Sequence, residues 1–98
     1  MTPAALAASV SKAVPPADLA TTVQALWWAA KGDWDKAHKI VQDDESAEAA
    51  WVHAYLHRVE GDLPNARYWY RTAGRPEAAG ALEEEWNAIA AALLNDSH

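Results

Sequence analysis

The chain has 98 residues, a formal net charge of −6, 51% apolar residues and no cysteine. A chain of this length forms one domain and buries roughly two-thirds of its unfolded surface. The lack of cysteine excludes disulfides and thiolate metal sites. The negative charge argues against a nucleic-acid partner, because such binding depends largely on neutralising phosphates.

The longest uncharged run in the body of the chain lies between Asp18 and Lys31 and is far too short to cross a bilayer. The Ala-rich start has no Lys or Arg before it, unlike a secretory signal peptide. We therefore expect a soluble, cytoplasmic protein with no membrane partner.

Residues 1–16 are predicted to form an N-terminal tail or short helix, because a proline pair closes this segment. Apolar residues spaced by three and four then predict a helix that starts at residue 17 or 18 and runs to residue 31. Gly32 has the position of a helix C-terminal glycine, and Asp33 can cap the next helix, "DWDKAHKIVQ".

A polar break, "DDES", precedes a third predicted helix that ends near Glu60. Gly61-Asp62 repeats the earlier glycine–aspartate pair and opens a fourth helix over about residues 63–73. The last helix is predicted over residues 76–94. No stretch alternates with period two, so we expect an all-α fold with residues 17–98 as a single domain.

An internal repeat connects these helices. A shift of 29 residues lays "AAKGDWDKAHKIVQ" over "RVEGDLPNARYWYR", so that Gly32 meets Gly61 and Ala37 meets Ala66. Two helix–turn–helix units with the same connections predict neighbouring hairpins stacked in parallel register.

The glycine–acid pair, the alanine five residues after that glycine, the apolar residue four further on and a closing proline resemble tetratricopeptide (TPR) repeats. The resemblance covers residues 20–76, with residues 77–94 in the place of a capping helix. It implies stacked antiparallel hairpins and a protein or peptide partner. With the helices predicted above we expect about five helices, and a second copy in a homodimer is a further candidate partner. The period of 29 departs from the roughly 34 residues of that family, and the family's peptide-terminus clamp has no matching residues.

The segments "GDWDKAHKIVQ" and "WVHAYLHRVEGDLPNARYWYRTAGRP" are also similar to a group of small bacterial proteins with no assigned function. This second resemblance covers residues 30–76 and implies no biochemistry.

The third helix carries a candidate metal site. His53 and His57 lie at i and i+4 on one face, Glu60 follows at i+7, and His38 of the second helix can add a third nitrogen. The alternative is a set of histidines bonded to Glu60, to backbone carbonyls or to water, with no cofactor. A zinc-protease motif is absent, because Ala54 stands where its glutamate would be.

A second candidate site, for a small anion or a partner, combines aromatic and arginine stripes of the third and fourth helices: Trp51, Tyr55, Arg58, Arg67, Tyr68 and Arg71. Guanidinium groups offer a planar fork to carboxylates or phosphates and stack on aromatic rings. The alternative is that these arginines pair with neighbouring acids in exposed ion pairs.

Trp27 and Trp28 point about 100° apart on a helix, so both cannot face one core. One of them is expected to meet the N-terminal segment or another subunit at an interface. The sequence contains no serine–histidine–acid or phosphate-loop pattern, and hence no catalytic residue is predicted. We expect a non-enzymatic protein-interaction module; the alternative is a protein that binds a metal ion or small anion, with enzymatic activity left open.

Overall fold

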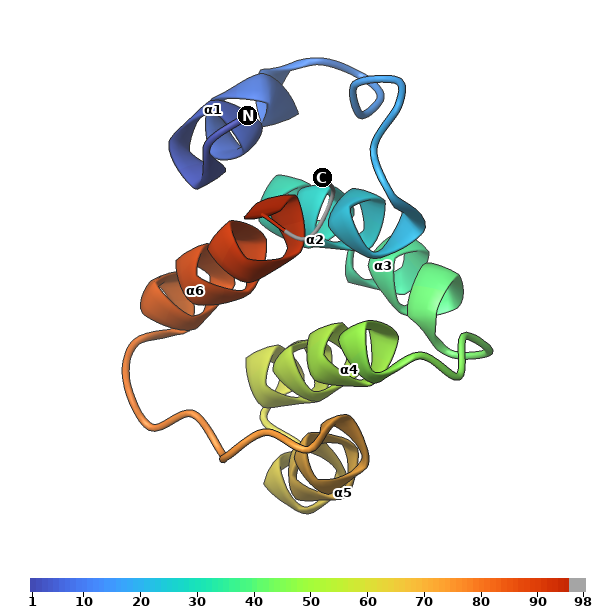
Figure 1. Cartoon of the computed structure of the whole chain (residues 1–98), viewed down its shortest axis with the longest axis vertical. Helices are drawn as coiled ribbons and strands as arrows, with labels where there is room; N and C mark the ends of the chain where they lie inside the picture. The colour runs from blue at the N-terminus through green and yellow to red at the C-terminus, as the bar shows by residue number, and fades with distance from the viewer. Residues whose placement is uncertain (96–98) are drawn as a thin grey trace.

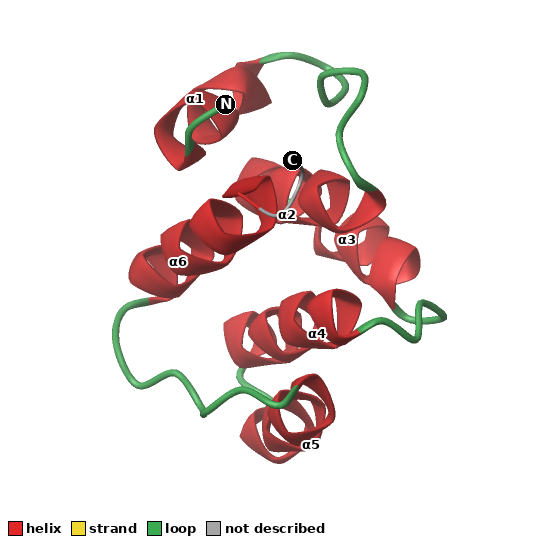
Figure 2. Ribbon diagram, in the orientation of Figure 1, coloured by secondary structure: helices red, strands yellow, loops and turns green. Residues whose placement is uncertain are grey.

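The computed structural model describes residues 1–95 and places them in a body of 33 × 27 × 26 Å. This part of the chain contains helices and loops without a strand, which confirms the predicted all-α class (Figure 2). The elements are, in order, α1 (Pro3–Ala8), a 3₁₀ turn η1 (Ser9–Ser11), α2 (Thr21–Lys31), α3 (Trp34–Val41), α4 (Ala47–Glu60), α5 (Leu63–Ala73) and α6 (Leu82–Asn95). No helix within residues 1–95 is long and apolar enough to span a membrane.

The two glycine–aspartate turns have the same geometry. Gly32 and Gly61 end α2 and α4 in the left-handed conformation, at φ +92° and +86°, which glycine adopts without strain. The carboxylate of Asp33 then accepts a hydrogen bond from the backbone N–H of Lys36, and that of Asp62 accepts one from Asn65. Each turn therefore joins two helices into a hairpin, α2–α3 and α4–α5.

Helix α4 lies in the middle of the molecule, where it packs against α2, α3, α5 and α6 (Figure 1). Its buried positions are Ala49, Ala50, Val52, His53, Ala54, Tyr55, Leu56 and His57. A helix that is buried on most sides brings its polar groups into the interior, where they need partners. This position explains why the third predicted helix is rich in both apolar and ionisable residues.

The N-terminal segment is part of the packed structure. Thr2 caps α1 through its side chain, and Leu6 of α1 is fully buried. The indole Nε1 of Trp27 donates to Ser9 Oγ at 2.9 Å, and the Lys31 ammonium bonds the carbonyls of Val10 and Lys12. The segment thus covers one side of α2.

Two helix starts differ from the prediction. The helix expected from residue 17 or 18 begins at Thr21, because Asp18 has a positive φ of 72° that a right-handed helix does not allow. The helix expected from residue 76 begins at Leu82. Residues 74–81 form a loop instead. The guanidinium of Arg58 in α4 donates a hydrogen bond to the carbonyl of Gly80 in this loop.

Helix α6 spans both hairpins rather than lying along the second one as a capping helix would. Its backbone approaches α1, α2 and α4 but not α5 (Figure 1). The reason is its apolar stripe, since Trp86, Ile89 and Leu93 belong to the same buried core as α1 and α2. Trp86 Nε1 also donates to the carbonyl of Leu26 at 2.9 Å. The outer side of α5 consequently remains exposed.

Candidate metal centre

The two helices that meet at the candidate metal centre are held together by Trp34. The indole of this first residue of α3 donates its N–H to the carbonyl of Leu56 in α4 at 2.7 Å. Its ring also stacks on the imidazole of His38, one turn further along α3, with centroids 4.7 Å apart and planes within 11°. Trp34 therefore directs His38 toward α4.

Helix α4 supplies two further imidazoles. His53 and His57 lie one turn apart with centroids 4.8 Å apart, and only 3% and 6% of their surfaces are exposed. On its other face, the His53 ring stacks on Trp69 of α5 at 3.9 Å between centroids. We call His38, His53 and His57 the histidine cluster.

The ring nitrogens of the histidine cluster converge. His38 Nε2 and His53 Nε2 are 3.0 Å apart, and one potential ligand nitrogen from each of the three rings lies within 4.8 Å of the other two. His57 Nδ1 lies 2.5 Å from Glu60 Oε1. A carboxylate can only accept, so Nδ1 of His57 carries a proton, and the lone pair of a neutral His57 ring is on Nε2.

Burial keeps two of these rings neutral at physiological pH. Desolvation, assisted by the neighbouring imidazoles His38 and His57, lowers the pKa of His53 to about 4. Desolvation also lowers the pKa of His38, against a smaller opposite effect of Glu60. His53 Nδ1 is buried without a hydrogen-bond partner among residues 1–95. Each neutral ring has one N–H and one lone pair, so each of these histidines can offer one nitrogen to a cation.

The structure brings together all four residues that the sequence analysis selected for a metal site, His38, His53, His57 and Glu60. Glu60 is not in direct reach of all three rings; it bonds His57 and thereby sets its tautomer. Asp62, which the sequence analysis placed at the start of the fourth helix and not in the metal site, forms a second group of potential ligands with His57 and Glu60. Asp62 follows Glu60 by two positions across Gly61, and this proximity in the sequence could have indicated its place beside the metal site.

The residues predicted for an anion or partner site do not converge. Arg58 is partly buried and pairs with Glu85 Oε1 of α6 at 3.0 Å, while Arg67 pairs with Glu77 in an exposed ion pair at 2.9 Å. Arg58 and Arg67 thus already pair with acids of different segments, and a clamp of Arg58, Arg67 and Arg71 stays a prediction. Pairing with neighbouring acids, the alternative interpretation, describes Arg58 and Arg67.

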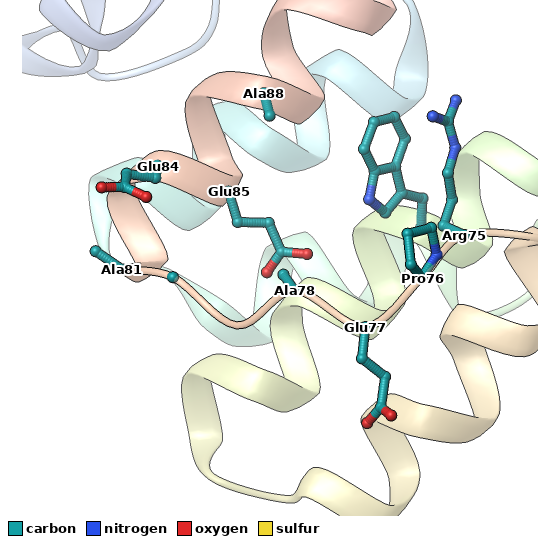
Figure 3. A pocket seen from close by; sticks show the side chains of 10 residues that line it. Arg75, Pro76, Glu77, Ala78, Ala81, Glu84, Glu85 and Ala88 are labelled. Carbon is teal, nitrogen blue, oxygen red and sulfur yellow. The ribbon is translucent and has the colours of Figure 1, made fainter.

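The aromatic members of that predicted site also lie apart. Trp51 borders a cavity of about 330 Å³ between α4, α6 and the 74–81 loop, where Arg75 Cζ lies 3.9 Å from the indole centroid. Figure 3 shows Glu85 reaching from α6 toward this loop at Ala78. Tyr55 is buried and borders a different hollow, beside α1 and α6, whereas Tyr68 is 53% exposed on α5.

Tyr70, which the sequence analysis did not select for a site, joins the ion pair of Arg58 and Glu85. The hydroxyl of Tyr70 donates to the second carboxylate oxygen of Glu85. Burial, followed by this hydrogen bond, raises the pKa of Tyr70, so the phenol keeps its proton. We call Arg58, Tyr70 and Glu85 the carboxylate cluster. Glu85 precedes Ile89 by four positions, so its place on the buried face of α6 was readable from the helical spacing.

The predicted interface residues Trp27 and Trp28 have different surroundings. Trp27 is fully buried and bonds Ser9 of the N-terminal segment, which was one of its two expected partners. It is therefore not available to another subunit. Trp28 is partly buried, packs edge-on against Trp27 and lies under the ammonium of Lys36 at 4.2 Å.

Comparison of the chain with protein-family models, with curated proteins and with solved structures finds no match.

Proposed function

We propose that this protein binds a divalent transition-metal ion through His38, His53 and His57. The observation that carries the proposal is the convergence of three imidazoles from two helices, with a ligand nitrogen from each within 4.8 Å of the others. Imidazole nitrogens suit zinc, copper, nickel and cobalt, whereas magnesium and calcium prefer oxygen ligands.

The spacing of the nitrogens supports this assignment. Two metal–nitrogen bonds of about 2.0–2.1 Å at a tetrahedral angle place the nitrogens roughly 3.3 Å apart. His38 Nε2 and His53 Nε2 are at 3.0 Å, so a slight outward rotation of the rings suffices for that pair. The ligand nitrogen of His57 lies within 4.8 Å of the other two nitrogens. It has to move closer to them than His38 and His53 do, by a rotation about the side-chain bonds of His57.

The contacts behind the rings also support it. Ligating histidines commonly donate their second ring N–H to a carboxylate, which orients the ring and makes the other nitrogen a better ligand. Glu60 has this relation to His57. Trp34 and Trp69 fix the planes of His38 and His53 by stacking, so the ligands are positioned before an ion arrives.

Metal titration of untagged protein tests the proposal. Chelator-stripped protein titrated with Zn²⁺ or Co²⁺ in a calorimeter should bind one ion per chain. His38→Gln should weaken binding by at least about tenfold, because it removes one of three ligands. The matched control is His98→Gln, which removes the remaining histidine of the sequence. Wild-type protein that takes up no ion, or equal affinities of the two variants, would overturn the proposal.

We also propose a second role, as a non-enzymatic interaction module of the TPR-like kind that associates with another copy. The supporting observation is that α6 leaves the outer side of α5 exposed, with Leu63 at 48% and Tyr68 at 53%. Sedimentation over a range of concentrations should show a dimer that Tyr68→Glu dissociates. A wild-type monomer at all concentrations would overturn this role without affecting the metal proposal.

A further inference from the structure

His57 belongs to two groups of potential ligands at once. With His38 and His53 it forms the histidine cluster, and with Glu60 and Asp62 it forms a second group whose ligand atoms also lie within 4.8 Å of one another. We call Glu60 and Asp62, together with His57, the outer group. One imidazole is thus common to an interior set of nitrogens and a set that includes two carboxylates.

The turn after α4 builds the outer group. Glu60 is the last residue of the helix, Gly61 reverses the chain, and the backbone N–H of Asp62 donates to the carbonyl of His57 at 2.9 Å. This hydrogen bond holds Asp62 directly beside the end of α4. The carboxylate of Asp62 is oriented in turn by its capping bond from Asn65.

The first hairpin has the same turn without the ligands. Its equivalent bond joins the N–H of Asp33 to the carbonyl of Trp28, also at 2.9 Å. In the 29-residue repeat, Trp28 corresponds to His57 and Lys31 corresponds to Glu60. The Lys31 ammonium would repel a cation. The turn geometry itself therefore does not require His57 or Glu60, and the exchange of these residues is what creates the outer group.

Exposure distinguishes the two groups. Asp62 is exposed and the Glu60 side chain is 38% exposed, whereas the side chain of His57 is 8% exposed. A hydrated cation can reach the two carboxylates from water and keep most of its water ligands there. His53 and His57 are buried and His38 is partly buried, so the ion must lose most of these waters to bind all three imidazoles.

We infer that Glu60 and Asp62 form a loading position for the metal ion, from which it moves past His57 to the histidine cluster. This inference rests on the proposed function. Nδ1 of His57 faces Glu60, and the opposite nitrogen, Nε2, is the ligand left for the interior ion. The carboxylates raise the local cation concentration and shorten the approach, while Nδ1 of His57 keeps its proton and its hydrogen bond to Glu60 throughout.

Asp62→Asn tests the inference in the full chain, since asparagine caps a helix as aspartate does but lacks the charge. Asp33→Asn removes the same charge from the same kind of cap in the first hairpin and is the matched control. Stopped-flow mixing of stripped protein with Co²⁺ should be followed by tryptophan fluorescence, because Trp34 and Trp69 stack on two of the ligands.

We expect Asp62→Asn to slow both association and release by about tenfold while Kd stays within about twofold of the wild type. Asp33→Asn should leave both rates unchanged. Rates of Asp62→Asn equal to those of Asp33→Asn, or a weaker Kd with an unchanged association rate, would overturn the loading position while the metal site itself stands. Absence of Co²⁺ binding by the wild type would instead refute the metal proposal. Asp62→Ser, which also caps, replaces Asp62→Asn if that variant does not fold.

Discussion

The histidine cluster and the carboxylate cluster occupy neighbouring faces of α4, and they differ in how completely the protein satisfies them. In the carboxylate cluster, Arg58 and Tyr70 donate to the two oxygens of Glu85, so opposite charges and complementary groups meet. In the histidine cluster, three rings of the same kind meet, and one contact of 3.0 Å joins two of them. The first is complete without any other molecule, whereas the second leaves Nδ1 of His53 without a hydrogen-bond partner among residues 1–95.

The largest effect should come from breaking the complete cluster. Glu85→Ala leaves the partly buried guanidinium of Arg58 and the buried phenol of Tyr70 without their carboxylate acceptor, and we expect a loss of about 3 kcal/mol in the free energy of unfolding. Urea denaturation measures it. Glu77→Ala is the matched control, because its ion pair with Arg67 is exposed and should contribute less than about 0.5 kcal/mol. Equal losses would show that the carboxylate cluster does not stabilise the fold in this way.

Acid should lower the free energy of unfolding of the metal-free protein through the histidine cluster. Burial lowers the pKa of His53 to about 4, from about 6.5 in the unfolded chain, so below pH 6.5 the unfolded chain binds more protons than the folded one. The free energy of unfolding of metal-free protein should therefore be constant above pH 7 and fall by about 1–3 kcal/mol between pH 6.5 and pH 4.

Urea denaturation at a series of pH values checks this sign. His53→Phe keeps an aromatic ring between Trp69 and His57 but cannot take up a proton, so its slope between pH 6.5 and 5 should be much smaller. A wild-type stability that rises as the pH falls through this range would contradict the assignment.

The smallest loss of stability is expected from a change in the histidine cluster of metal-free protein. His38→Gln in metal-free protein removes one hydrogen bond between neutral groups at a partly buried position and should cost about 1 kcal/mol or less. The same variant is the one expected to lose the metal ion. A cost as large as that of Glu85→Ala would mean that the histidine cluster serves the fold in the same way as its neighbour.

The helices and the histidine cluster were largely predictable, and the carboxylate cluster was not. His53 and His57 share a face by helical spacing alone, and the repeat placed the helix of His38 next to theirs. Arg58 and Glu85 are 27 positions apart, and their meeting depends on α6 crossing α4. The loop of residues 74–81 decides that crossing, and it contains residues that we had expected to be helical.

The amino-acid sequence by itself determined the helices, the two glycine–aspartate turns and the spacing of the ligands within α4. These features depend on interactions within a few residues, namely helical periodicity, capping by aspartate and the left-handed conformation of glycine. Only the tertiary structure decided that Trp27 is covered by the N-terminal segment, that α5 keeps an exposed side, and that Glu85 faces Arg58. Those contacts join positions far apart in the chain, and they follow from which apolar surfaces bury one another best.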